Sequence, residues 1–280
     1  MIETKNLTKK FDSFTAVDSL DLRIETGEFF GLLGPNGAGK TTTISLLSTL
    51  LLPTAGEILI NGQCAGRNRP DLKRKISVIT QEYSMRQDMN MDEIMEYQGR
   101  LYFMPRKEIK EKTEELLDFC GLLPFRKRTV RKLSGGMKRK LMVCRALLTS
   151  PEILLLDEPT AGMDALSRRQ MWNLLRQLNG KNLTILLTTH YMEEAQSLCN
   201  RVALMDHGKL EEINTPSGLI ESLGKYTVDQ ETPEGPKSHY FHSRADAIAF
   251  LSSLDGQCTL RETTLEDVFV ERAGRHLMQR

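Results

Sequence analysis

Residues 34–42, GPNGAGKTT, have the composition and spacing of a loop that binds phosphate groups. They fit the pattern GxxxxGK[ST], and they lie between an apolar segment and a helical one, which is the context the pattern requires. Glycines let backbone amides turn toward phosphate oxygens, and a helix that begins at Lys40 adds the positive end of its dipole. Lys40 would neutralise the β- and γ-phosphates of a triphosphate, and the Thr41 hydroxyl would bind magnesium. The alternative is a glycine-rich turn that only connects a strand to a helix.

Two acids and a histidine end the apolar segments that follow. ILLLDEP, at 153–159, has the pattern of a strand buried on both faces, and ligands bind at the carboxyl ends of such strands. Asp157 is therefore expected to hold magnesium through water, and Glu158 to accept a proton from the attacking water. TILLTTH ends similarly at His190, and adjacent parallel strands would bring both ends to one edge, which favours a γ-phosphate contact. In the alternatives, Glu158 only begins a loop and His190 is structural.

A second helix start that could bind an anion lies in LSGGMKRK, at 133–140. Ser134 is a good N-cap, and Gly135 and Gly136 leave backbone amides uncovered. One chain thus offers two anion-binding helix starts.

The elements that must position these residues alternate between apolar strands and helices. Strands are expected at 2–7, 20–24, 29–33, 57–60, 76–80, 153–156, 184–188, 201–205 and 209–213. Helices are expected at 40–51, 91–103, 107–120, 135–149, 165–178 and 192–198. Such alternation indicates a parallel α/β sheet. Two successive helical patterns within 91–123 predict a helical insertion. After about residue 224 the alternating pattern gives way to a stretch containing Pro and Gly, which predicts a small module with a short strand and helices at 244–254 and 264–272.

Composition restricts the class of protein. The chain has 280 residues, 40% of them hydrophobic and 27% charged, which is typical of a globular fold and argues against disorder. The net charge of +1 provides no global field for a polyanion or an anionic membrane. The five cysteines are scattered and form no CxxC, so a disulfide framework or a zinc site is not expected. The longest uncharged run, 41–56, is too short to span a bilayer, and no secretory signal is visible, so the cytoplasm is expected.

Together these motifs resemble the nucleotide-binding subunit of an ATP-binding cassette (ABC) transporter. The matching pieces, in the family's order, are GPNGAGKTT, Gln81 after a strand, LSGGM, ILLLDE, the turn AGMD ending at Asp164, and His190. The resemblance implies an α/β P-loop NTPase fold, with a RecA-like parallel-sheet core, an N-terminal antiparallel β subdomain and a helical insertion at about 88–150. It assigns 1–223 to the ABC ATPase domain and leaves 224–280 as a small C-terminal α+β accessory module.

The resemblance also implies a head-to-tail dimer, in which each ATP lies between the phosphate loop of one copy and the LSGG segment of the other. The residues it implies in ATP binding are Phe11, Gly34, Pro35, Asn36, Gly37, Ala38, Gly39, Lys40, Thr41, Thr42, Ser134, Gly135, Gly136 and Asp164. Those implied in catalysis are Glu158, His190, Lys40 and Gln81, and those implied in Mg²⁺ binding are Thr41, Gln81 and Asp157. Phe11 would stack on adenine, where relatives more often have tyrosine; the alternative is an ordinary core phenylalanine.

The chain departs from the family pattern in two motifs. Met137 stands where glutamine is commonest, which puts a polar contact with the nucleotide in doubt. Met163 and Ala165 replace the usual leucine and proline on either side of Asp164, where a contact across the dimer is still expected.

Three stretches bear on the partners. The segment 125–140 carries eight Lys/Arg and no acid, but without interleaved aromatics it is interpreted as a solvated rim, so no nucleic acid is expected. The region 81–103 holds Met85, Met89, Met91 and Met95, and in the family it receives a short helix of the membrane subunit; the alternative for each methionine is core packing. TLEDVF, at 264–269, resembles a phrase of ATPases in the drug-resistance, sodium-export and lipid- or polysaccharide-export group, whose partners are ABC-2-type permeases.

The resulting expectation is an ATPase subunit of an ABC-2-type exporter, held at the cytoplasmic face of the membrane by integral permease subunits. Two alternatives remain open. One is a soluble ABC ATPase that acts on nucleic acid or the ribosome, and the other is an ATP-binding regulator without turnover. The second is disfavoured because Lys40, Asp157, Glu158 and His190 are all present.

Overall fold

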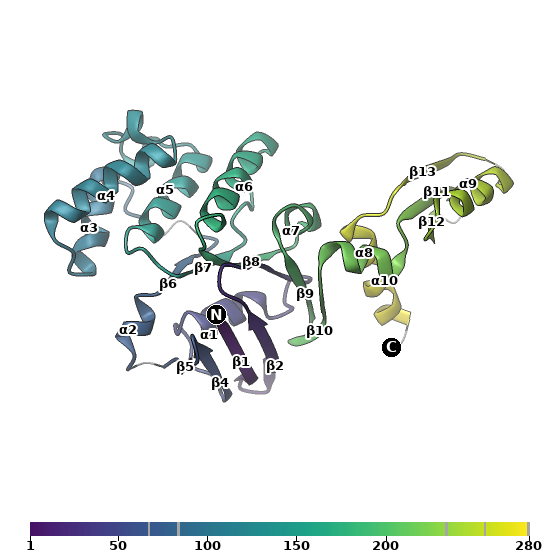
Figure 1. Ribbon diagram of the computed structural model, residues 1–280, viewed down its shortest axis with the longest axis horizontal. Helices are drawn as coiled ribbons and strands as arrows, with labels where there is room; N and C mark the ends of the chain where they lie inside the picture. Colours follow the sequence, from purple (N-terminus) through teal and green to yellow (C-terminus); the bar gives the residue numbers. More distant parts are fainter. Residues whose placement is uncertain (67, 83–84, 233–234, 255, 279–280) are drawn as a thin grey trace. The chain divides into compact units, whose positions relative to one another are not determined.

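The computed structural model describes the chain except residues 67, 83–84, 233–234, 255 and 279–280, with side chains as far as residue 272 in the last helix. The described residues form two compact units (Figure 1). The first comprises Met1–His190 and Ala203–Glu212, and the second comprises Tyr191–Val202 and Ile213–Arg280. The domain boundary at residues 223 and 224 stays a prediction.

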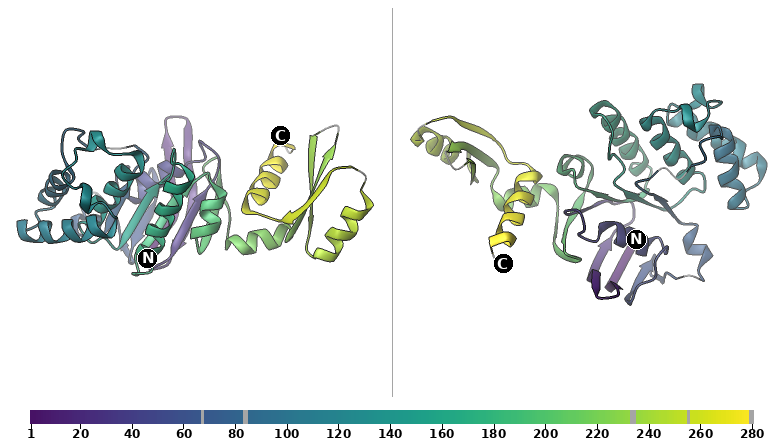
Figure 2. Two further views of the ribbon diagram at one scale, coloured as in Figure 1. Left: turned by 90° about the horizontal axis from the view of Figure 1, so that it is seen from above. Right: turned by 180° about the vertical axis from the view of Figure 1, so that it is seen from behind.

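Six strands form the central sheet, which belongs mainly to the first unit, in the order β10-β9-β3-β8-β7-β6. They are β3 (Phe29–Leu33), β6 (Ile76–Ile79), β7 (Ile153–Asp157), β8 (Thr184–Thr189), β9 (Arg201–Asp206) and β10 (Lys209–Asn214). Neighbours among β3, β8, β7 and β6 pair in parallel, and every residue of β3, β7 and β8 is buried. Both faces of the sheet are covered, with α5 and α6 on one side and α1 on the other (Figures 1 and 2). The predicted parallel core is confirmed.

A second sheet of the first unit has the order β2-β1-β4-β5 and is antiparallel. Its strands are β1 (Ile2–Phe11), β2 (Phe14–Ile24), β4 (Ala55–Ile60) and β5 (Gln63–Cys64). Strands β1 and β2 are much longer than the strands expected at 2–7 and 20–24. Three register shifts interrupt their pairing, so the simple alternation of apolar and polar residues is lost along the hairpin.

The helices of the first unit are α1 (Lys40–Leu47), α2 (Pro70–Lys73), α3 (Met91–Leu101), α4 (Arg106–Phe119), α5 (Gly135–Leu147) and α6 (Ala165–Asn179). The short turns η1 (Leu123–Phe125) and η2 (Val130–Lys132) connect α4 to α5. Helices α3, α4 and α5 pack together as the insertion between β6 and β7. Helix α1 ends earlier than expected, because the backbone turns left-handed at Thr49, which stops the hydrogen-bond ladder.

The second unit contains α7 (Met192–Leu198), α8 (Pro216–Leu223), β11 (Tyr226–Thr232), β12 (Gly235–Phe241), α9 (Arg244–Ser253), β13 (Cys258–Glu262) and α10 (Leu265–Met278). The sheet order is β12-β11-β13, whereas the sequence predicted one short strand. The difference arises because β12 and β13 are edge strands whose residues are mostly exposed or half-buried and carry little apolar alternation. The expected helix 264–272 is extended to Met278.

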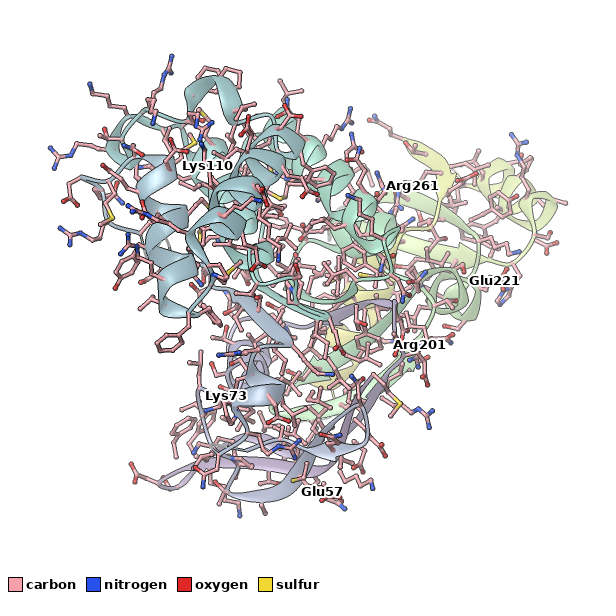
Figure 3. The ribbon with its side chains drawn as sticks, turned by 60° about the vertical axis from the view of Figure 1, so that its left-hand side comes forward. Glu57, Lys73, Lys110, Arg201, Glu221 and Arg261 are labelled. Atoms are coloured by element: carbon pink, nitrogen blue, oxygen red, sulfur yellow. The ribbon has the colours of Figure 1, made fainter. Side chains whose placement is uncertain are left out.

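The TLEDVF segment begins α10, and its role in the fold is now explicit. The sequence also predicts an amphipathic helix with Leu265, Val268 and Phe269 on one face. Leu265 and Val268 are buried, Phe269 is half-buried, and α10 contacts α7 and α8. The Asp267 carboxylate accepts hydrogen bonds from the Thr264 backbone N–H (2.7 Å) and hydroxyl (2.8 Å), and it pairs with Arg261 on β13. Arg261 is labelled in Figure 3. The motif therefore caps and anchors the last helix.

Among the helices that the structure describes, none combines the length and the apolar character that crossing a bilayer requires.

Candidate functional site

The phosphate-type loop is built on the buried end of β3. Gly34 packs so closely on the carbonyl oxygen of Met205 that a Cβ atom would collide with it. Gly39, the N-cap of α1, has φ of 102°, a left-handed conformation that favours glycine. The loop can therefore keep its path only with glycine at both positions.

Lys40 is folded into this loop and is only 6% exposed. Its ammonium group donates to the carbonyl oxygens of Gly34 (2.8 Å) and Pro35 (2.9 Å). Burial lowers the pKa of Lys40, and the nearby charges of Glu158 and Asp157 act in the opposite direction. A desolvated cation held by weak neutral acceptors is well prepared to exchange them for phosphate oxygens.

Asp157 lies at the end of β7 between two hydroxyl groups. Its Oδ1 accepts a hydrogen bond from Thr188 Oγ1 at 2.6 Å and from Thr41 Oγ1 at 3.2 Å. Thr188 lies on β8 and Thr41 on α1, so the carboxylate joins the sheet to the first helix. The two residues that the sequence predicts to bind magnesium are thus in direct contact.

Glu158 and His190 are in direct contact. Glu158 Oε1 lies 3.0 Å from His190 Nδ1, and the two side chains are 13% and 39% exposed. Glu158 has φ of 47°, and its backbone N–H donates to the carbonyl oxygen (3.1 Å) and hydroxyl (3.2 Å) of Thr188. This left-handed turn redirects the chain after β7 and points the carboxylate toward the end of β8, where His190 follows.

The predicted second anion site lies at the start of α5. Ser134 is exposed and caps the helix by accepting from the Met137 N–H (3.3 Å). Gly136 lies against Ser167, since a Cβ atom there would be 3.2 Å from its hydroxyl oxygen. Ser167 donates two hydrogen bonds to the carboxylate of Asp164, the N-cap of α6. Its backbone N–H binds Oδ1 at 2.9 Å, and its hydroxyl binds Oδ2 at 2.7 Å. The LSGG and AGMD segments therefore adjoin within one chain.

Two further predicted residues lie at the surface. Gln81 is exposed, and its backbone carbonyl accepts from Arg139 Nη1 at 3.3 Å. Phe11 is 43% exposed, and the Lys9 ammonium lies 5.0 Å from the centre of its ring. Phe11 is therefore not a core residue, and its ring can already interact with a positive group.

Two interpretations of the sequence need correction. Arg139 belongs to the basic stretch interpreted as a solvated rim, yet it is only 2% exposed. Met85, Met91 and Met95 are buried, so they pack in the core and do not line an open groove. Residues 83–84 of that region lie outside the described part of the chain.

Sequence reasoning also missed two polar residues of the site, Thr188 and Arg139. Thr188 could have been noticed as a polar residue inside an aliphatic strand, next to the acid-bearing strand. Arg139 gave no such signal, because its neighbours in sequence are basic as well.

The oxygen atoms at this edge suit magnesium. No group of three or more His, Cys, Asp or Glu residues that could hold a metal occurs in the described part of the chain. Mg²⁺, however, is usually held by one or two protein oxygens together with water and substrate phosphates. The Thr41 hydroxyl and the Asp157 carboxylate, 3.2 Å apart beside the phosphate-type loop, fit that type of site.

Comparison with known proteins agrees with this geometry. Residues 17–161 match the family model for the ABC transporter. The chain is 37% identical over 235 residues to the linearmycin resistance ATP-binding protein of Bacillus subtilis, covering 84% of this chain and 76% of that protein. It is 35% identical over 299 residues to the Nod factor export ATP-binding protein I of Cupriavidus metallidurans, covering 99% and 98%.

A solved structure of an ATP-binding cassette, a dimeric post-hydrolysis state bound to ADP and Pi, aligns with a TM-score of 0.69 at 27% identity. The alignment covers 77% of this chain and 98% of that one. The family model covers more than half of the chain, and a relative above 30% identity is covered almost completely. The chain therefore belongs to the ABC transporter family, whose ATP-binding cassettes hydrolyse ATP.

Proposed function

We propose that this chain, an ATP hydrolase of the ABC transporter family, is the motor subunit of an ABC-2-type exporter. The observation that carries the proposal is the contact between Glu158 and His190 (3.0 Å), beside a buried Lys40 and the Thr41–Asp157 pair. In this proposal Glu158 is the base, Lys40 is the cation that binds phosphate, and the Thr41–Asp157 pair supplies oxygens for a metal.

The loop residues bind and orient the triphosphate. Lys40 exchanges its bonds to the loop carbonyls for bonds to the β- and γ-phosphates, and the amides from Gly34 to Thr42 surround the phosphate chain. Phe11 supplies a stacking surface for adenine. Thr41, Asp157 and Gln81 would hold Mg²⁺, which when bound neutralises charge on the phosphates.

Glu158 and His190 handle the water and the γ-phosphate. The Glu158 carboxylate accepts a proton from the water that attacks the γ-phosphorus, while the remainder of the triphosphate leaves as ADP. His190, held against Glu158 Oε1, keeps that carboxylate in place and contacts the γ-phosphate. Ser134, Gly135 and Gly136 of a second copy close the site from the other side, and Asp164 contacts across the same dimer.

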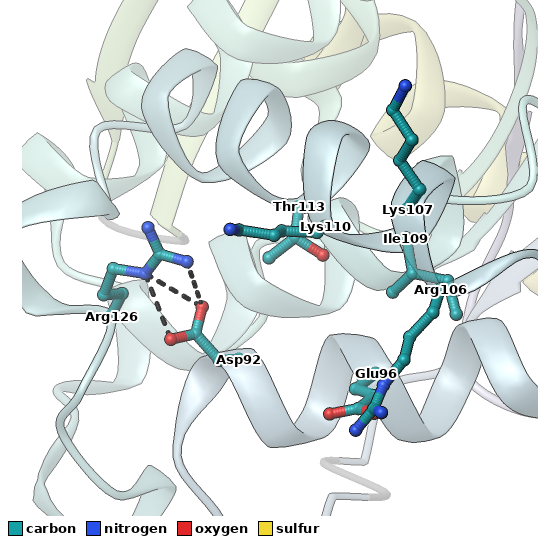
Figure 4. Close-up of a pocket in the computed structure, with 8 residues that line it drawn as sticks. All are labelled: Asp92, Glu96, Arg106, Lys107, Ile109, Lys110, Thr113 and Arg126. Atoms are coloured by element: carbon teal, nitrogen blue, oxygen red, sulfur yellow. Dashed lines mark hydrogen bonds and ion pairs between the residues drawn. The ribbon is translucent and has the colours of Figure 1, made fainter.

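ATP binding then joins two copies and hydrolysis releases them, a motion that is passed to integral permease subunits at the cytoplasmic face of the membrane. The contact surface for the permease is the helical insertion. A cavity of about 520 Å³ opens there between α3 and α4 (Figure 4). Tyr97 and Leu101 on α3 and Phe103 just after it are 52%, 54% and 86% exposed. The two export and resistance relatives support this role, and they give no support to a nucleic-acid or ribosomal function.

Replacement of the base tests the proposal. Glu158→Gln keeps the size of the side chain and removes its ability to accept a proton, so ATP should still bind while turnover falls by at least roughly 100-fold. The matched control is Glu193→Gln, an exposed acid in the first turn of α7, which should hydrolyse ATP at the wild-type rate. Normal hydrolysis by Glu158→Gln would refute the assignment of the base.

A further inference from the structure

Arg139 lies on α5, the helix that begins with the LSGG segment, and its guanidinium group reaches two separate stretches of backbone, 80–81 and 158–159. Its Nη2 donates to the Glu158 carbonyl oxygen at 2.7 Å, and its Nε donates to the Pro159 carbonyl oxygen at 2.6 Å. Its Nη1 donates to the Thr80 carbonyl oxygen at 2.7 Å and to that of Gln81 at 3.3 Å. Arg139 is also among the largest fully buried side chains of the molecule.

These bonds act on the proposed base through its backbone. Glu158 is held at φ of 47°, a conformation that costs a residue with a side chain on the order of 1 kcal/mol. Thr188 binds the N–H on one side of this residue, and Arg139 binds the carbonyl on the other. With both flanking peptide groups held, the Cα–Cβ direction of Glu158 is determined, and the carboxylate is directed to His190.

We infer that Arg139 is a positioning residue for hydrolysis, which holds the carboxylate of Glu158 in register with the Gln81 loop and with the helix that carries the LSGG segment. The inference rests on the proposed role of Glu158 as the base. Because one rigid group binds the Gln81 loop and the Glu158 turn together, a displacement of either loop, or of α5, is transmitted to the base. The site can then respond to contacts made at the loop and at the helix start.

Arginine is required here for a geometric reason. A guanidinium group presents five N–H donors in a fixed planar fork, and Arg139 uses Nε, Nη1 and Nη2 in different directions. A lysine has one nitrogen at the end of a flexible chain, so it keeps the positive charge but cannot reproduce these bonds to both stretches at once. Arg139→Lys therefore separates the geometry from the charge.

The test is steady-state ATP hydrolysis by Arg139→Lys and Arg139→Gln, expressed per nucleotide-binding site. For Arg139→Lys we expect kcat to fall roughly 10- to 100-fold, since misplacement by about 1 Å can cost that much, while KM for ATP stays within about threefold because the Lys40 loop is intact. Arg139→Gln should lose at least as much. Arg145→Lys, on the same helix and half-buried, is the matched control and should keep wild-type kcat.

A purely structural role would lower the amount of folded protein without changing kcat per site. Wild-type kcat per site in both variants, or failure of both to fold, would therefore overturn the positioning role. The result is distinguishable from failure of the proposed function. If Glu158→Gln hydrolyses ATP normally, the base assignment fails, whereas an inactive Glu158→Gln beside a fully active Arg139→Lys refutes the positioning role alone.

Discussion

Thr188 offers the sharpest test of how the site is held together. It is completely buried, and its hydroxyl donates to Asp157 Oδ1 at 2.6 Å and accepts from the Glu158 N–H at 3.2 Å. Valine has nearly the same shape, so Thr188→Val removes these bonds without leaving a cavity. The matched control is Thr188→Ser, which keeps the hydroxyl and loses only a methyl group.

The magnitude follows from the two contacts. A hydrogen bond to a charged group contributes about 1.5–3 kcal/mol, and the Glu158 N–H keeps its second acceptor, the Thr188 carbonyl at 3.1 Å. Thr188→Val should therefore lower the free energy of unfolding of the first unit by about 2 kcal/mol, or the urea midpoint by roughly 1 M. Because the positions of Asp157 and Glu158 both depend on this hydroxyl, kcat for ATP should also fall roughly 10- to 100-fold.

The assay can be confined to the first unit. Trp172 on α6 is the single tryptophan of the sequence, so its fluorescence during urea unfolding reports on that unit. Thr188→Ser should lose about 1 kcal/mol, the value of one buried methyl group, and should keep kcat. Wild-type stability and wild-type kcat in Thr188→Val, or equal losses of kcat in both variants, would show that the Thr188 hydroxyl does not hold Asp157 and Glu158 in place.

Two other predictions concern the loop and the last helix. Lys40→Ala should weaken ATP binding at least roughly tenfold in calorimetric titration, because the charge-assisted bonds to phosphate are lost, and unchanged affinity would contradict the role of this residue. The free energy of unfolding of Lys40→Ala should not fall below that of the wild type. Burial lowers the pKa of Lys40, so folding disfavours its charged form, and the substitution removes that charge. For Asp267, burial alone would raise the pKa, but hydrogen bonds from Arg261 and Thr264 outweigh it, and the folded value lies below the ordinary one. The stabilisation by Asp267 is thus present above the unfolded pKa of about 3.9 and is lost as pH falls through the folded pKa, so the protection factors of the α10 amides should decrease below about pH 4. Asp267→Asn should show reduced protection factors already at pH 7, and the exposed neighbour Glu266→Gln should not.

The central sheet and most of the site could be predicted from sequence because their signals are local. Continuous aliphatic runs ending in Asp157 and His190 indicate buried parallel strands, and parallel strands must end at one edge. The contact between Glu158 and His190 follows from that rule. The glycine spacing of the phosphate-type loop likewise encodes backbone geometry directly.

The residues that were missed act through distant backbone groups. Arg139 and Thr188 bind carbonyls, an N–H and a carboxylate on other elements, and no spacing along the chain reveals such partners. Helix α8 is a different case. Its N-cap Thr215 and the proline that follows are local signals of a helix start, and they could have identified it. The strands of the second unit lacked an apolar pattern to detect.

The proposed mechanism requires ATP to bind between two copies of this chain, held by the Lys40 loop of one and the start of α5 of the other. A crystal structure of Glu158→Gln with ATP and Mg²⁺ would show whether it does. We predict a head-to-tail dimer in which the segment from Ser134 to Gly136 of the second copy lies within hydrogen-bonding distance of the γ-phosphate. A structure in which ATP occupies the Lys40 loop while that segment faces bulk solvent in every copy would contradict this mechanism.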